Sequence, residues 1–189
     1  MEKLHRKNRT QPKMILCLVS LFIVFVLFNS SYAQDVAVGQ ATATVLATLT
    51  VTATQSLTLG NVYQGVPTSI ANNNANAAIF TITGAVSSGI SLFISLPDYL
   101  ALANGSDRMT ISFSSTDASV DSLGAGDPTT MAGGAGWQNT NPYSLPSATV
   151  IGSGGTTNVY LGGKALPAVD QSAGSYSADI ILTVAYNGT

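Results

Sequence analysis

The sequence predicts an all-β protein, an antiparallel β-sandwich, and three observations lead to this prediction. Residues 41–54 alternate between apolar side chains and threonine, broken only at Leu46, so an extended strand there has one apolar and one polar face. Further short runs rich in β-branched and aromatic residues follow, separated by Gly, Asn and Pro turns at a spacing of about ten residues. After residue 33 no segment shows an apolar stripe of helical period.

Residues 1–33 have the order of parts found in a secretory signal peptide. Five basic residues precede residue 14, residues 14–28 are apolar and uncharged, and Ser31 and Ala33 supply small side chains at the −3 and −1 positions of a cleavage site. An uncleaved anchor is the alternative, but this apolar run falls short of the roughly 20 residues that span a bilayer. We expect cleavage after Ala33, export to the cell surface or the extracellular space, and no stable membrane span afterwards.

The composition of the mature chain excludes several function classes. Cleavage removes Glu2, His5 and Cys17, which are the only Glu, His and Cys, and leaves two basic residues, Arg108 and Lys164, against eight Asp, a formal charge of −6. An acidic chain without a basic patch is not expected to bind nucleic acid. Without His or Cys, the mature chain cannot form a Ser-His or Cys-His nucleophilic site, and it lacks the usual zinc ligands. It also cannot form a disulfide. We expect no catalytic residue and no enzyme activity.

The mature chain is predicted to consist of an extended arm, residues 34–46, and a sandwich domain, residues 47–189. Six strands are predicted in that domain, at residues 47–54, 77–83, 90–96, 109–115, 156–161 and 177–186. An immunoglobulin-like sandwich has about seven strands, and the last predicted strand ends close to the end of the sequence. We therefore expect an immunoglobulin-like sandwich with an open sheet edge. An open edge together with a spare extended strand favours strand addition between molecules.

Turns rich in Asn, Ser and Gly separate these strands, at residues 72–76, 87–89 and 104–107. The longest segment between two predicted strands is residues 116–155, which are rich in Gly, Ser and Thr and contain three prolines. We expect a long loop there, with a short hairpin around residues 148–151.

Three aspartates of this loop, Asp117, Asp121 and Asp127, offer the oxygen ligands that calcium prefers. Their spacing does not match the calcium loop Asp-x-Asp-x-Asp-Gly. A solvated acidic loop, in which the carboxylates bond their own backbone, is the simpler interpretation. We expect neither a metal nor a cofactor.

Two aromatic residues of the same loop, Trp137 and Tyr143, stand among amide side chains. If they are exposed, their rings can stack on sugar rings and make a ligand contact. If they are buried, they cover one end of the sandwich. Both interpretations remain open from the sequence.

Residues 49–60 resemble a secreted bacterial family, domain-of-unknown-function family 4402, and so do residues 160–166, 174–176 and 180–186. The last three segments are also similar to spore-coat U and chaperone–usher pilin subunits, which close with a Gly-x-Tyr turn and an alternating strand bearing a near-terminal Tyr. The pilin resemblance implies an incomplete sandwich that the N-terminal arm of the next subunit completes. The residues of the arm that would enter the neighbouring subunit are Val36, Val38, Gly39, Ala41, Ala43 and Val45, with Gly39 at a place of close approach. Many pilins carry a disulfide, which this mature chain cannot form.

Two functions follow as hypotheses. The first is a secreted structural subunit of a pilus-like or fimbrial fibre on the bacterial surface, a homo-oligomer joined by strand addition, with an export chaperone as a candidate partner. The second is a monomeric secreted adhesin or glycan-binding module, whose arm folds into its own sheet and whose ligand contacts Trp137 and Tyr143.

Overall fold

The computed structural model describes residues 40–124 and 126–188. The chain divides into two units, Met1–Ala43 and Thr44–Thr189, and every strand and helix of the described residues lies in the second unit. The expected signal peptide and the arm residues Val36, Val38 and Gly39 lie outside the described residues.

The first sheet has five antiparallel strands in the order β1–β3–β10–β7–β8. These are β1 (Thr50–Gln55), β3 (Ala78–Thr83), β10 (Thr156–Leu161), β7 (Ala118–Asp121) and β8 (Trp137–Thr140). At its centre, Val159 of β10 pairs with Phe80 of β3 and with Val120 of β7. Because directly paired residues point to the same side of a sheet, these three apolar side chains together enter the core.

Two further antiparallel sheets form the opposing part of the sandwich, with strand orders β12–β5–β6–β11–β2 and β13–β4–β9. The second sheet has five strands, β12 (Tyr176–Ser177), β5 (Tyr99–Leu102), β6 (Arg108–Ser112), β11 (Gly163–Leu166) and β2 (Thr68–Ile70). The third sheet has three strands, β13 (Ile181–Tyr186), β4 (Gly89–Ser95) and β9 (Thr149–Val150). One helical turn, α2 (Pro128–Met131), lies between β7 and β8, and Asp127 caps it by accepting a hydrogen bond from Thr129 N.

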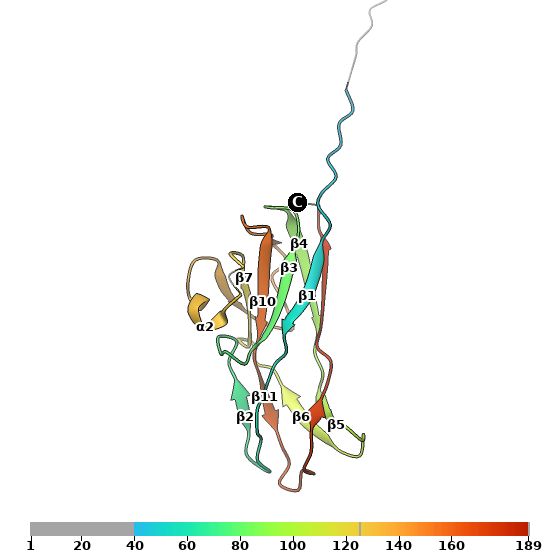
Figure 1. Cartoon of the computed structure of the whole chain (residues 1–189), viewed down its shortest axis with the longest axis vertical. Helices are drawn as coiled ribbons and strands as arrows, with labels where there is room; N and C mark the ends of the chain where they lie inside the picture. The colour runs from blue at the N-terminus through green and yellow to red at the C-terminus, as the bar shows by residue number, and fades with distance from the viewer. Residues whose placement is uncertain (1–39, 125, 189) are drawn as a thin grey trace, which may run out of the picture. The chain divides into compact units, whose positions relative to one another are not determined.

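Short interruptions divide what would otherwise be long strands (Figure 1). Gly162 alone separates β10 from β11, so the chain passes from the first sheet to the second at this residue. A Cβ at Gly162 would overlap the carbonyl oxygen of Ile70, which explains why glycine is needed here. Residues 96–98, which include Pro97, separate β4 from β5 in the same way, because proline cannot donate to the ladder.

The core is one apolar cluster drawn from all three sheets. It includes the buried residues Phe80, Ile82, Ile90, Ile94, Leu100, Met109, Ile111, Phe113, Val120, Val159, Leu161 and Leu182. Along β6, for example, the buried Met109 and Ile111 alternate with polar residues, as the period of two requires. The predicted all-β, antiparallel sandwich is confirmed.

Each of the six predicted strands overlaps an observed one, but the ends differ. β1 begins at Thr50, three residues later than predicted, and the predicted strand at 177–186 is divided into β12 and β13. The prediction of a long loop over residues 116–155 was wrong, because β7, β8, β9 and α2 lie within it. The expected hairpin at 148–151 is also absent. There, β9 pairs instead with the start of β4.

Candidate functional site

A groove of about 1110 Å³ opens between two segments that are far apart in the sequence. Its first wall is residues 55–64, which continue from β1, and its second wall is residues 171–180, which contain β12. Its floor includes Phe80, Leu100, Met109 and Ile111, all members of the buried core. The groove therefore gives access to the core of the sandwich from the side.

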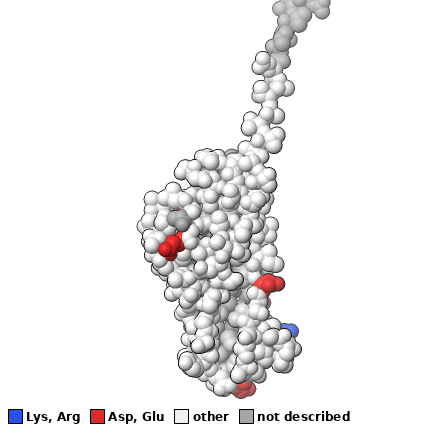
Figure 2. All heavy atoms as spheres, in the orientation of Figure 1, with Lys and Arg blue, Asp and Glu red and all other residues white. Residues whose placement is uncertain are grey.

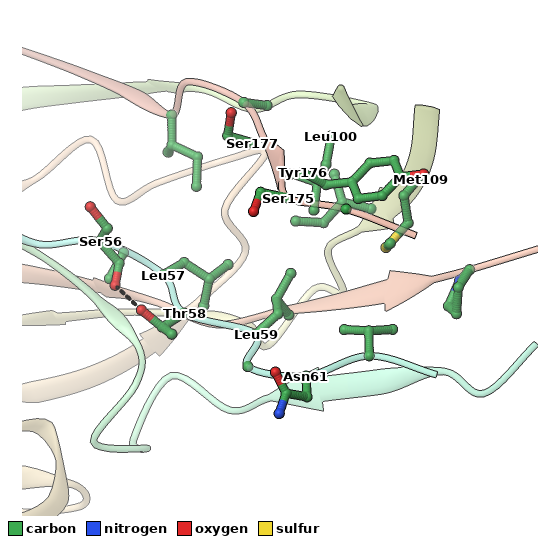
Figure 3. A pocket seen from close by; sticks show the side chains of 18 of the residues that line it. Ser56, Leu57, Thr58, Leu59, Asn61, Leu100, Met109, Ser175, Tyr176 and Ser177 are labelled. Atoms are coloured by element: carbon green, nitrogen blue, oxygen red, sulfur yellow. Dashed lines mark hydrogen bonds between the residues drawn. The ribbon is translucent and has the colours of Figure 1, made fainter. Parts of the chain in front are cut away.

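The first wall presents apolar side chains to the groove. Leu57, Leu59 and Val62 are half-buried and pack against the core cluster. Figure 3 shows Leu57 and Leu59 on one side of the groove, with Leu100 and Met109 across it. Thr58 N donates to Asn76 O at 2.9 Å. The wall is thus fastened to the body of the sandwich, with its apolar side chains turned inward.

The second wall carries Tyr176 and Ile180, which are half-buried against the same core cluster. It is attached to β5 by the short strand β12 and by Ala103 N, which donates to Ser175 O at 3.0 Å. Asp179 is the one charged residue among the described residues that line the groove. The groove is therefore lined by apolar and neutral polar groups almost throughout.

A cluster of four residues, Asp107, Gln171, Ser172 and Tyr176, fixes one end of the second wall. Asp107 Oδ2 accepts hydrogen bonds from Gln171 Nε2 at 2.7 Å, Ser172 N at 2.8 Å and the Tyr176 hydroxyl at 2.8 Å. The Ser172 N–H, then the Tyr176 hydroxyl and the Arg108 N–H, hold the pKa of the Asp107 carboxyl well below its usual value, because these hydrogen bonds stabilise the charged form. We call this the Asp107 cluster.

The two walls meet beside the Asp107 cluster. Gly65 N donates to Ala168 O at 3.0 Å, and Gln64 Nε2 donates to Gln171 O at 2.7 Å. These bonds join the end of the first wall to the start of the second, so they close this end of the groove.

The other end of β1, outside the groove lining, is held by Tyr186, the last residue of β13. Its hydroxyl accepts a hydrogen bond from Ala85 N at 2.7 Å and donates to Ala47 O at 2.9 Å. A Cβ at Gly84 would lie 2.6 Å from this hydroxyl, so glycine leaves the space that the tyrosine occupies. One hydroxyl thus connects the residues before β1, the turn after β3 and the last strand.

Between these two ends the sandwich has an unpaired rim. Among the described strands, β1 pairs only with β3, and β13 pairs only with β4, so both are edge strands. Val51 is paired with the core residue Ile82 and so faces inward, yet it is 39% exposed. Ala53, paired with Phe80, is also exposed. Inward-facing apolar residues remain exposed here, where no described strand is hydrogen-bonded to β1 on this side.

The described part of the predicted arm, residues 40–46, is exposed and belongs to no strand. This includes Ala41, Ala43 and Val45, of which Val45 is 94% exposed.

The structure places the two candidate ligand contacts, Trp137 and Tyr143, in different surroundings. Trp137 on β8 is half-buried, stacks on Tyr160 with ring centroids 5.0 Å apart, and donates from Nε1 to Asn139 Oδ1 at 2.9 Å. Tyr143 is 65% exposed in a turn closed by a bridge between Asn141 and Ser144. Within residues 40–124 and 126–188, no ring contact joins Trp137 to Tyr143.

The three aspartates considered as calcium ligands have structural roles. Asp117 Oδ2 accepts from Ser114 N at 2.7 Å, Asp121 Oδ1 accepts from Leu123 N at 2.9 Å, and Asp127 caps α2. The described residues contain no group of three His, Cys, Asp or Glu side chains that could hold a metal ion.

Sequence reasoning did not find the floor of the groove or the Asp107 cluster. For the floor, the alternation along β5 could have predicted a strand, since Leu100 and Leu102 are buried and alternate with exposed Tyr99 and Ala101. No comparable signal exists for Asp107, because its partners come from a segment more than sixty residues later.

No protein-family model matches the chain, and none of the curated proteins searched is similar to it. In the part of the chain that the structure describes, no helix is long and apolar enough to cross a membrane.

Proposed function

We propose that the protein is an exported structural subunit that assembles into a surface or extracellular fibre, with the groove of one subunit accepting an extended strand from another molecule. The observation that carries this proposal is the groove itself, whose floor is the buried core and whose walls are the segment after β1 and the segment before β13. An added strand would pack against the half-buried Leu57, Leu59 and Ile180 of the walls and would pair with backbone groups along the rim, as strand addition requires.

The N-terminal arm has the length and chemistry for this role. Residues 34–46 number thirteen and reach about 43 Å when extended, whereas each wall of ten residues spans about 33 Å at most. The arm has one charged residue, Asp35, at its start, and small apolar residues such as Ala41, Ala43 and Val45 further along. Small side chains suit a groove that is bounded by two walls and a packed floor.

Surface charge gives no competing means of assembly. Figure 2 shows a face with charged side chains at only a few places, and the mature chain has only two basic residues. Backbone hydrogen bonds and apolar burial are therefore the main available interactions. Because an open edge invites wrong pairing, a chaperone that covers the groove in the periplasm fits the same proposal.

Deleting the arm tests the proposal. A mature chain without residues 34–45 is expected to remain folded and soluble, because residues 44–189 form a compact unit with its own core, but it should no longer polymerise. Light scattering after gel filtration and negative-stain images of both chains measure this. Fibres from the deletion variant would rule the proposal out.

The second candidate function, a monomeric adhesin or glycan-binding module, is supported by Tyr143, whose ring is exposed in a fixed turn. A glycan array of the mature protein tests it, and an array without a signal would count against it.

A further inference from the structure

Four buried polar residues lie together on the outer face of the first sheet. Asn158 of β10 is paired with Asp121 of β7, and Tyr160 of β10 is paired with Ser119 of β7. Paired residues point to the same side of a sheet, and so do residues two apart along a strand, so the four side chains share one face. Each of them is at most 1% exposed. We call these four residues the β7–β10 cluster.

The chain between β7 and β8 covers this cluster closely. A Cβ at Gly126 would lie 3.9 Å from Asn158 Nδ2, and a Cβ at Gly136 would lie 3.0 Å from Asp121 Oδ1, so the backbone of the cover passes directly over the polar side chains. The helical turn α2 belongs to this cover and lies beside β7 (Figure 1). The cover thus separates the cluster from water.

Two oxygen atoms of the cluster, Ser119 Oγ and Asn158 Oδ1, have no hydrogen-bond partner among the described residues. The Asn158 amide is oriented by its other atom, Nδ2, which donates to the Tyr160 hydroxyl at 3.2 Å. A buried acceptor without a partner costs the free energy of its lost hydration. Two such oxygens on one covered face, on neighbouring strands, therefore point to a bound group that satisfies both.

The charge of the cluster favours a cation as this group. Asp121 Oδ1 accepts a hydrogen bond from Leu123 N at 2.9 Å. A carboxylate has about four acceptor positions, so Asp121 can keep this bond and also bind a cation. Burial, followed by the charges of Asp121 and Asp127, raises the pKa of the Tyr160 phenol, so both carboxylates act on the cluster.

No basic side chain belongs to this part of the fold. The five strands of the first sheet contain neither Lys nor Arg, and residues 122–136 contain none in the sequence. The two basic residues of the mature chain, Arg108 and Lys164, lie on β6 and β11 of the second sheet. A metal cation can supply the positive charge that the side chains here do not.

We infer that the β7–β10 cluster binds a calcium ion, with the Asp121 carboxylate, Asn158 Oδ1 and Ser119 Oγ as ligands. Calcium takes about six to eight oxygen ligands in flexible geometry, whereas magnesium keeps several waters, for which a covered cluster is unsuited. With few charged ligands, the expected dissociation constant is of the order of 10⁻⁴–10⁻³ M. The bound ion would fasten the cover to the sheet. This inference is independent of strand addition.

The site differs from the calcium loop considered from the sequence. Of the three aspartates of that loop, only Asp121 is a ligand here. The other two ligands are neutral side chains, and one of them, Asn158, comes from a strand far along the chain.

Thermal unfolding tests the inference. The mature chain is treated with EDTA, exchanged into chelator-free buffer, and heated with CaCl₂ or with MgCl₂ at equal ionic strength. Calcium should raise the thermal midpoint saturably, by about 3 °C or more at ten times the dissociation constant, and magnesium should raise it less. No rise with calcium up to about 10 mM, or an equal rise with magnesium, would overturn the inference.

Two variants locate the ion. Ser119→Ala removes a buried hydroxyl that lacks a partner, so without calcium it should unfold at or above the wild-type midpoint, but its rise with calcium should be less than half that of wild type. Asn158→Asp places a second carboxylate opposite Asp121, which should lower the midpoint without calcium and enlarge the rise with calcium.

The matched control, Asn73→Asp, makes the same substitution in an exposed turn and should keep the wild-type rise. If Ser119→Ala and Asn158→Asp both keep the wild-type rise, calcium binds elsewhere on this acidic chain and the inference is wrong. If Asn158→Asp folds in neither condition, Ser119→Ala alone decides, and a wild-type rise in that variant overturns the inference.

Discussion

The two long sides of the sandwich differ in how their outer strands are covered. On the side of β7 and β8, polar residues on the outer face of the first sheet are fully buried, among them Asn158, Tyr160, Ser119 and Asp121. On the side of β1 and β13, inward-facing Val51 and Ala53 remain exposed, and a groove reaches the core. We refer to these as the closed side and the open side.

The closed side is covered by the chain between β7 and β8. Trp137 at the start of β8 stacks on Tyr160, with ring centroids 5.0 Å apart. Burial raises the pKa of this phenol, because the charged form loses its hydration. Among the described residues, the segment from β7 to β8 covers the closed side, and no segment covers the open side. This difference is what the proposed strand addition requires.

The largest expected effect is at the closed side. Tyr160→Ala removes a fully buried ring, and substitutions of this kind cost about 3–5 kcal/mol of the free energy of unfolding. Urea denaturation measures the loss, and Tyr99→Ala, at an exposed site on β5, is the control and should cost far less. A small effect of Tyr160→Ala would mean that the closed side is not a packed part of the fold, and the comparison between the two sides would lose its basis.

On the open side, a charge in the groove should affect binding more than stability. Leu59→Asp places a carboxylate on the first wall, where an added strand would bury it, so affinity for a peptide with the sequence of residues 34–46 should fall at least tenfold. The fold should survive, because Leu59 is only half-buried. Thr52→Asp, on the exposed outer face of β1, is the control and should bind as wild type. Equal affinities for the two variants would argue that the strand binds elsewhere.

The two sides also differ in how much of them was predictable. The strands with strict alternation, such as β13 with Leu182, Val184 and Tyr186, were found because one buried face leaves a period of two in the sequence. The open edge was predicted from a count of six strands, but the described residues form thirteen, so that premise was wrong, although β1 and β13 are edge strands of their sheets. Its position was not predicted, because the floor brings together residues of β3, β5 and β6 that are distant in sequence.

On the closed side, the sequence analysis did not predict strand β7, and the reason is different. β7 contains Ala118, Ser119, Val120 and Asp121, which alternate between apolar and polar side chains over only four residues, the shortest run that indicates a strand. Ser119 and Asp121 are buried by the segment that returns over them, which is a tertiary effect that local propensity does not contain.

The Asp107 cluster should make the second wall depend on pH. The pKa of Asp107 is lowered on folding, so its contribution to stability is fully present above the unfolded value of about 3.8 and is lost as the pH falls through the lower folded value. Asp107→Asn should therefore lower the thermal midpoint at pH 7, and the difference from wild type should shrink below pH 4. Asp170→Asn, at an exposed site, is the control. If the difference in thermal midpoint between Asp107→Asn and wild type is constant from pH 7 to pH 2.5, the charge of Asp107 does not stabilise the second wall.

The smallest expected effect is at Tyr143, and it separates the two candidate functions. Because this side chain is exposed, Tyr143→Ala should change the free energy of unfolding by less than about 0.5 kcal/mol, and it should leave assembly and peptide binding unchanged if the open side joins the subunits. If the protein is instead a glycan-binding module, the same substitution should abolish the glycan signal without unfolding the protein. Trp137→Phe keeps an aromatic ring against Tyr160 and is the matched variant, since it alters the neighbouring closed side while leaving Tyr143 in place. Assembly that fails in Tyr143→Ala would place a subunit contact outside the groove, and the difference between the closed and the open side would then no longer explain how the molecules join.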